Sequence, residues 1–314
     1  MNEVLTVGFI TSVLAAAIAG GAAILYAALG EVFAERAGVL NLGVEGMMLV
    51  GALGGVAVCT WTGSAVVGAL GAILFGALLA AVHAFLTISL RANQVVSGLA
   101  LTLFGQGATA YLGASLVGAP PPDRFSKLAI PVLSDIPRLG EILFRQDLLV
   151  YLAYVVVPVA WWFIYRTRPG LELRAVGENP ATADAMGLSV ARIRYAYVLI
   201  GGALAGLGGA VISLATNPGW SENLTAGRGW IAVALVIFGT WNPARVALGA
   251  LLFGAVEAGQ FRLQGVNVPV SSFFLSMLPY LFTILVLVVA TQRTRRMRIG
   301  QPAALGEAYV REER

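Results

Sequence analysis

Hydrophobic residues occur in long uninterrupted runs, and the polar residues are collected between these runs. A transmembrane helix needs about 20 predominantly apolar residues, and several of the runs reach that length. Asn242-Pro243, between two shorter runs, indicates either a tight turn or a broken, re-entrant helix. The pattern predicts an all-α, polytopic membrane bundle that forms a single transmembrane domain. Nine spans are expected, at 5–29, 38–61, 66–90, 94–117, 148–165, 195–216, 229–241, 245–261 and 271–291.

One short stretch of sequence occurs twice. Residues 69–77 read ALGAILFGA and residues 247–255 read ALGALLFGA. These stretches fall in the third and eighth predicted spans, which cross the membrane in opposite directions. Similar sequence in opposite orientation predicts an inverted-topology repeat with halves at about 5–117 and 195–291, an arrangement typical of alternating-access transporters. The alternative is a chance match between strings of common membrane residues.

The distribution of arginine predicts the orientation of the bundle. Five arginines lie in 166–194 and four in 293–298, whereas the basic residues of 118–147 are balanced by acidic ones. Because cytoplasmic loops carry an excess of Lys and Arg, we expect the first two segments inside, and 118–147 and the N-terminus outside. The composition agrees with membrane insertion, since 58% of residues are hydrophobic and only 11% are charged.

The sequence lacks the residues that several kinds of chemistry require. Cys59 and His83 are the sole members of their types, so neither a disulfide framework nor a multi-histidine metal site is possible. Lys127 is the only lysine and is not part of a phosphate-binding loop. We therefore expect no metal or other cofactor and no nucleic-acid partner, and any ATP hydrolysis must take place on another polypeptide.

The predicted inside segment 166–194 is too polar for lipid and too long for a bare turn. Its middle carries helix signals, with Asn179 as N-cap, Pro180 at the first helical position and Gly187 as a stop after 181–186. We expect a short helix that docks into a cleft on a soluble partner; the alternative is a helix lying on the headgroups. The candidate docking residues are Glu178, Asn179, Pro180, Ala181, Ala183, Asp184 and Gly187.

A second polar cluster opens the second predicted span. Asn41 and Glu45 lead directly into apolar sequence, and a carboxylate at membrane depth normally faces the bundle interior or a water-filled route. Asn41 and Glu45, with Asn93 and Gln94 behind them, are therefore candidates for lining a pathway. An equally weighted interpretation makes Glu45 a cap near a helix N-terminus, where the helix dipole favours a negative charge. Glu257 should likewise have a partner such as Arg262, or face a water-filled lumen.

Three segments resemble one family of membrane proteins. Residues 38–52 (GVLNLGVEGMMLVGA), 174–190 (RAVGENPATADAMGLSV) and 227–243 (GRGWIAVALVIFGTWNP) are similar to the permease subunits of ABC importers for ribose and other simple sugars. The chain looks most like the permeases of nucleoside uptake systems that use basic-membrane-protein-type binding lipoproteins. The ending at 299–314 also resembles this branch.

The resemblance implies a multi-pass permease subunit in the lipid bilayer of a bacterial inner membrane, translocating nucleosides, with simple sugars as the alternative. It also implies ABC ATPase subunits whose groove receives 174–190, a second and different permease subunit, and an extracytoplasmic substrate-binding lipoprotein. Two rivals follow from the residues alone. A secondary transporter or channel would use Glu45 and Glu257 as ion sites, whereas a lipid-acting enzyme is disfavoured because no nucleophile motif is present.

Overall fold

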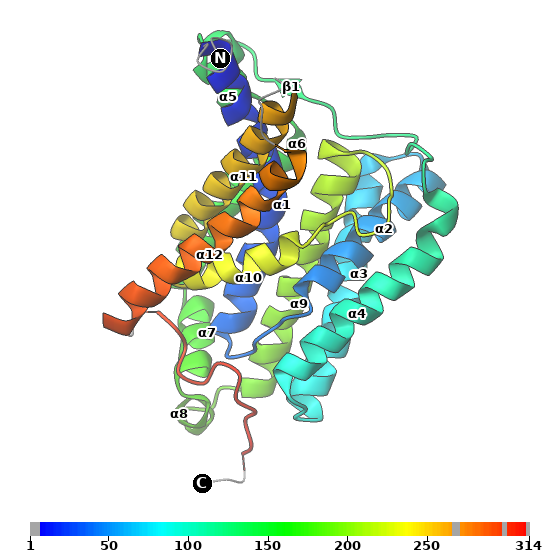
Figure 1. Cartoon of the computed structure of the whole chain (residues 1–314). Coiled ribbons are helices and arrows are strands. Elements are labelled where there is room, and N and C mark those ends of the chain that lie inside the picture. Colours follow the sequence, from blue (N-terminus) through cyan, green and yellow to red (C-terminus); the bar gives the residue numbers. More distant parts are fainter. Residues whose placement is uncertain (1–6, 266–270, 297–299, 312–314) are drawn as a thin grey trace.

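The computed structural model describes residues 7–265, 271–296 and 300–311 as an almost entirely helical protein (Figure 1). Two-residue strands, β1 (Leu128–Ala129) and β2 (Arg145–Gln146), pair antiparallel. The α-helices are α1 (Val7–Arg36), α2 (Val44–Thr62), α3 (Ala65–Ala84), α4 (Gln94–Gly113), α5 (Leu139–Leu143), α6 (Leu148–Arg166), α7 (Arg168–Glu178), α8 (Pro180–Ala185), α9 (Val190–Ala210), α10 (Arg228–Phe238), α11 (Pro243–Gly265) and α12 (Ser272–Arg296). Single π-helical turns, Phe85–Ser89 and Val211–Thr216, extend α3 and α9.

The long helices run between two ends of the molecule, which we name the α5 end and the α8 end (Figure 1). The α5 end carries α5, the two strands and the start of α1, and the α8 end carries α7, α8 and the C-terminal tail. Within the described residues, seven helices are long and apolar enough to cross a membrane, and 228–238 and 273–285 are shorter apolar stretches. The all-helical membrane bundle predicted from the sequence is therefore confirmed, and nine spans is an approximate count.

The ends of some helices differ from the predicted spans, because parts of the chain inside the protein are not helical. The second span does not begin at residue 38, because 37–43 is non-helical and α2 starts at Val44. The eighth span is a full-length helix, α11, whereas the seventh is only the 11-residue α10. A turn joins these two helices at 239–242, as Asn242-Pro243 indicated. Apolar runs alone did not distinguish a buried non-helical segment from a helix.

The two predicted halves share one order of elements. A long helix is followed by a non-helical segment, a helix that starts within the bundle, and two more helices; the series is α1 to α4 in one half and α9 to α12 in the other. The repeated strings lie in α3, which starts at the α5 end, and in α11, which starts at the α8 end (Figure 1). These directions are the ones that an inverted-topology repeat requires; the repeat itself stays a prediction.

Backbone-to-backbone contact holds the centre of the bundle together. A Cβ atom on Gly51 of α2 would lie 2.4 Å from the Cα atom of Gly206 of α9, and one on Gly76 of α3 would lie 2.3 Å from the carbonyl oxygen of Gly202. Such close approach maximises dispersion contact between helices, which is important in lipid because apolar burial from water contributes little there. The glycines of α9 therefore fix α2 and α3 against it.

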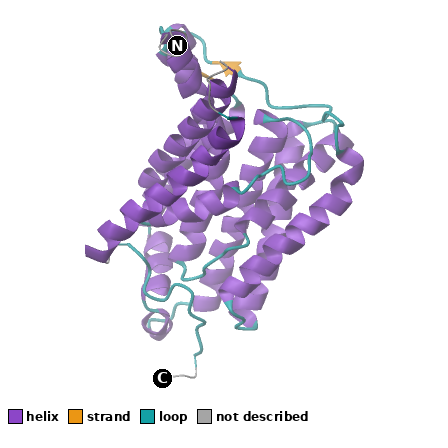
Figure 2. Cartoon of the chain, in the orientation of Figure 1, coloured by secondary structure: helices purple, strands orange, loops and turns teal. Residues whose placement is uncertain are grey.

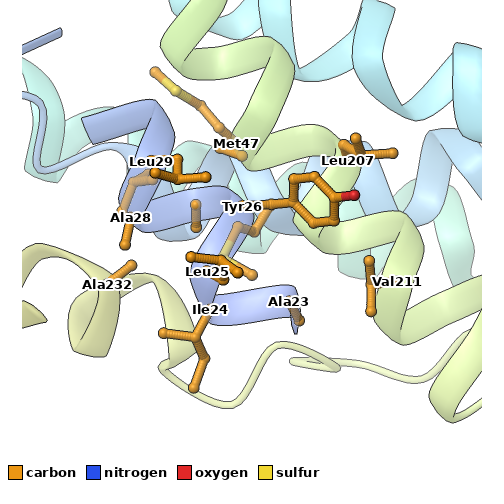
Figure 3. Close-up of a cluster of buried hydrophobic side chains, with 14 of the residues drawn as sticks. Ala23, Ile24, Leu25, Tyr26, Ala28, Leu29, Met47, Leu207, Val211 and Ala232 are labelled. Carbon is orange, nitrogen blue, oxygen red and sulfur yellow. The ribbon is translucent and has the colours of Figure 1, made fainter. Parts of the chain in front are cut away.

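α1 lies in the middle of the described fold and is buried over much of its length. Figure 3 shows Ile24, Tyr26 and Leu29 of α1 among side chains from α2, α9 and α10. The Tyr26 hydroxyl donates a hydrogen bond of 2.7 Å to the carbonyl oxygen of Leu149 in α6. This helix therefore contacts elements of both predicted halves.

Replacing Gly206 by leucine should destabilise the protein, because its Cβ atom would lie 2.2 Å from the Ala72 carbonyl oxygen. Overpacking of this kind costs about 1–3 kcal/mol of unfolding free energy. The measurement is the thermal midpoint of the detergent-purified protein. Gly107→Leu is the matched control, since a Cβ atom on Gly107 meets nothing within 4 Å. Equal midpoints for the two variants would contradict the tight α2–α3–α9 packing.

Candidate functional site: the junction of two half-helices at Glu45

Two helices, α2 and α10, begin inside the bundle instead of at its ends. Residues 37–43 enter from the α8 end and lead into α2, and residues 217–227 descend from the α5 end and lead into α10 (Figure 2). Non-helical backbone is tolerated at membrane depth only where protein or water supplies its hydrogen bonds. The partners of these two segments therefore define the site.

Polar side chains from three other helices satisfy the 37–43 segment. The Leu40 amide donates to Gln94 Oε1 at 2.7 Å, and the Leu40 carbonyl accepts from His83 Nε2 at 3.1 Å. Thr102 Oγ1 donates to the Leu42 carbonyl at 2.9 Å. The Asn41 amide bridges Glu31 Oε1 and the Gly43 N–H, at 2.9 and 3.0 Å. The polar residues that lie within apolar runs here serve as backbone partners.

Glu45 joins the start of α2 to the start of α10. Its Oε1 accepts from Thr225 Oγ1 at 2.5 Å and from the Gly227 N–H at 2.9 Å, and its Oε2 accepts from the Gly229 N–H at 2.6 Å. The side chain is buried, with 1% of its surface exposed. The carboxylate is therefore held entirely by donors from the 225–229 segment, about 180 positions away in the sequence.

The two helix N-termini meet closely at this point. A Cβ atom on Gly229 would lie 2.5 Å from the Glu45 Cα, so only glycine fits there. Each helix N-terminus carries a partial positive charge and unpaired N–H groups, and a carboxylate between them is favoured by both. Of the two sequence-based interpretations of Glu45, the geometry matches a helix cap. Glu45 caps the N-terminus of α10, however, and lies inside the bundle instead of at the membrane interface.

A cavity of about 840 Å³ lies between α1, α11, the end of α9 and the 125–147 region. Its described lining includes Leu224, just before α10, and Arg228, the first residue of α10, so it reaches from the α5 end to the half-helix junction. Phe125 and Phe261 offer aromatic surface, and Thr216 and Asn217 offer polar atoms. Its described lining also contains seven charged residues: Lys127, Glu141, Arg145, Asp147, Arg228, Glu257 and Arg262. A concave site of this size is typical of small-molecule binding.

An ion pair between Arg228 and Glu257 lies on the wall of this cavity. Glu257 has an arginine partner, as the sequence analysis expected, but this partner is Arg228, whose Nη2 donates to Glu257, and not the suggested Arg262. Both Glu257 and Arg262 line the cavity. Arg228 Nη1 also donates to the carbonyl oxygens of Leu224 and Thr225, at 3.4 and 3.2 Å. The pair therefore ties the start of α10 to α11.

The four residues proposed to line a pathway are only partly brought together. Asn41, Glu45 and Gln94 are buried around the 37–43 segment, whereas Asn93 is exposed and caps α4 by accepting from the Val96 N–H at 3.1 Å. The described lining of the cavity contains none of the four. The sequence analysis did not identify Thr225 and Arg228 as site residues. The Gly-Arg-Gly at 227–229 was the available signal, because glycine allows the start of α10 to lie close to the start of α2.

The 166–194 segment forms two helices at the α8 end. In α8, Asn179 Oδ1 accepts from the Thr182 N–H at 2.9 Å, and Gly187 adopts a φ of +86°, as the cap and stop signals predicted. Ala183 is buried against Val176 and Val190.

The sequence analysis missed the second helix, α7. Its start is marked by Thr167, whose Oγ1 accepts from the Gly170 N–H at 3.2 Å, followed by Pro169. Ala181 and Met186, at opposite ends of α8, are both exposed, and α8 therefore offers an accessible surface at this end.

Replacing Glu45 by glutamine should lower stability, because an amide NH₂ would face either the Gly229 N–H or the donors at Oε1. A buried donor without an acceptor costs about 1–3 kcal/mol. The measurement is again the thermal midpoint in detergent. Glu222→Gln is the control, since Glu222 is exposed on the same 217–227 segment. A midpoint for Glu45→Gln equal to that of the control would contradict the proposed bridge.

Comparison with known proteins gives this arrangement a context. The family model described as a branched-chain amino acid transport system permease component matches residues 13–281. A Haloferax volcanii protein provisionally named as a glucose ABC transporter permease is 45% identical over 97% of this chain and 99% of its own. A nucleoside ABC transporter permease of Lactococcus lactis is 38% identical, covering 84% and 87%. A guanosine ABC transporter permease of Bacillus subtilis is 34% identical, covering 98% and 99%. Each of these organisms also supplies a second, less similar permease.

A solved structure shares the fold. It is an inward-facing ABC transporter provisionally described as of the metal-chelate type, with a TM-score of 0.51 and 15% identity over 93% of this chain and 88% of that chain. Three findings lead to one conclusion: the described residues contain seven helices long and apolar enough to cross a membrane, the family model matches most of the chain, and relatives match over nearly their full length. The chain belongs to the branched-chain amino acid transport system permease component family, and it is a multi-pass membrane permease of an ABC transporter.

Proposed function

We propose that this chain is the permease subunit of an importer that carries nucleosides across a bacterial inner membrane, and that ATP is hydrolysed on separate ATPase subunits. The observation that carries the energy coupling is the capped α7–α8 pair at the α8 end. In this proposal the α8 end faces the cytoplasm, and residues 174–190 fit a groove on the ATPase. The lack of a phosphate-binding loop supports a separate ATPase.

The cavity near the α5 end has the size and the aromatic and polar groups that suit a small-molecule substrate. A nucleoside offers a flat base for Phe125 or Phe261 and ribose hydroxyls for Thr216 and Asn217. Two of the three relatives described above are named for nucleosides or guanosine. A simple sugar is the alternative, favoured by the 45% identical relative that is named for glucose.

The remaining components follow from the same proposal. An extracytoplasmic binding lipoprotein delivers the substrate to the α5 end, where the cavity opens. The second permease subunit is a different chain, which the paired permeases in each of the three organisms support. Asn41, Glu45 and Gln94 stay candidates for the pathway in another access state, since they surround the entry segment of α2.

Substrate choice is tested by uptake into proteoliposomes that contain the complete transporter with its binding protein and internal ATP. We expect ATP-dependent uptake of radiolabelled guanosine or adenosine that excess unlabelled nucleoside abolishes and excess glucose or ribose leaves unchanged. A mutant ATPase unable to hydrolyse ATP is the control for energy dependence. Uptake of glucose that nucleosides fail to inhibit would establish the sugar alternative instead.

Docking on the ATPase is tested at Met186, which follows α8 and is 80% exposed. Met186→Glu should reduce copurification of the ATPase, because a carboxylate would be desolvated in an apolar groove. Val132→Glu is the matched control, since Val132 is 78% exposed but lies in the chain between β1 and α5, at the α5 end. Normal insertion with unchanged ATPase binding in both variants would place the docking surface elsewhere.

A further inference from the structure

The described C-terminal tail has no part in the proposal so far. We name residues 300–311 the C-terminal strap; it passes beneath the bundle at the α8 end in Figure 1. Although the strap has no helix or strand, two of its residues, Pro302 and Ala304, are buried. Burial of irregular backbone indicates specific contacts, because its polar groups require partners.

The strap is bound to the end of α7. The Ala304 N–H donates to the Gly177 carbonyl at 2.9 Å, and the Ala303 N–H donates to Glu178 Oε2 at 3.3 Å. A Cβ atom on Gly177 would lie 3.3 Å from the Pro302 Cβ on one side and 2.1 Å from the Arg36 carbonyl on the other. The end of α7 is therefore enclosed between the strap and the end of α1.

The strap also holds α8. Arg311 Nε lies 3.1 Å from Asp184 Oδ2, and Tyr309 packs on the small cluster of Val176, Ala183 and Val190. The Arg311 side chain is 75% exposed, so this ion pair by itself contributes little. The apolar packing of Tyr309 and the backbone hydrogen bonds to α7 provide the stronger attachment.

The same strap also contacts the segment that leads into α2. Buried Arg194 donates from Nη1 to the Glu307 carbonyl at 2.9 Å and from Nε to the Ala37 carbonyl at 3.2 Å. The Gly306 N–H donates to the Gly38 carbonyl at 3.3 Å, at the start of the segment that leads into α2.

At its other end, the strap lies against the turn that follows α10. Gly300 adopts a φ of +103°, and a Cβ atom there would lie 2.7 Å from the carbonyl oxygen of Thr240. One 12-residue segment thus contacts α7, α8, the entry to α2 and the exit of α10.

We propose that the C-terminal strap positions the coupling helices relative to the half-helix junction, so that movement of α7–α8 is passed to α2 and α10. The inference rests on the proposed function, in which α7–α8 docks on an ATPase. Hydrogen bonds and close packing act over less than 4 Å, so the strap stays attached to both regions only when they move together. Ala304 and Arg194 are positioning residues in this scheme, and neither contacts substrate.

The first test places a large side chain at a buried position of the strap. Ala304→Trp should detach it, because Ala304 is 5% exposed, whereas Ala303→Trp is the matched control at an exposed neighbour whose backbone hydrogen bond is kept. In proteoliposomes that contain the full transporter, we expect Ala304→Trp to lower nucleoside uptake per ATP hydrolysed by about fivefold or more, a typical allosteric coupling. Hydrolysis should continue, since only transmission is lost.

The second test avoids any steric clash. Deleting residues 300–314 removes the strap, and deleting 312–314 is the control. The larger deletion should uncouple hydrolysis from uptake as Ala304→Trp does. Either variant assembling with a wild-type ratio of uptake to hydrolysis would overturn the inference. Failure of both to bind the ATPase, with the control variants bound and all four permeases equally monodisperse, supports positioning of α7–α8 by the strap. Absence of ATP-driven uptake by the wild-type transporter would instead reject the proposed function.

Discussion

Backbone that leaves the helix inside a bilayer needs hydrogen-bond partners from protein or water for its N–H and C=O groups, and much of this structure follows from that constraint. Two segments, 37–43 and 217–227, break their helices at depth, and polar side chains on other helices supply the partners. Gln94 accepts from the Leu40 N–H, and His83 donates to the Leu40 carbonyl. Glu45 accepts from the Gly229 N–H at the start of α10. The polar residues of the membrane-spanning region are therefore arranged around the breaks.

The electrostatics of the junction follow from the same break. Two helix N-termini that face each other place two partial positive charges close together, which is unfavourable in a medium of low dielectric constant. Glu45 lies between them, and its three donors all come from the 225–229 segment. Arg228, the cation within that segment, is paired with Glu257 and lines the cavity instead. The Glu45 carboxylate is thus balanced by dipoles, and Arg228 is neutralised by Glu257 at the cavity wall.

Local signals were predictable from the sequence, whereas long-range partners were not. Asn179, Pro180 and Gly187 defined α8 because caps act within a few residues. The pairs Glu45–Thr225 and Arg228–Glu257 depend on which helices pack together, and hydropathy carries no such information. The non-helical 37–43 segment was read as helix because its residues are as apolar as those of a span. Its defining feature, a set of hydrogen-bond partners on α3 and α4, lies far away in the sequence.

Helix α10 is held by a different kind of contact from the one that joins α2, α3 and α9. α2, α3 and α9 meet through glycine backbones, and separating them would leave a void that no side chain fills. α10 is instead fastened at both ends by polar groups, to Glu45 at its start and, after its end, through Trp241, whose Nε1 donates to Glu35 and whose carbonyl accepts from Arg36. Polar contacts can be exchanged for water or substrate at small net cost, whereas backbone packing cannot. We therefore expect a change of access to move α10 against a fixed α2–α3–α9 unit, with Arg228 at the start of α10 on the wall of the cavity.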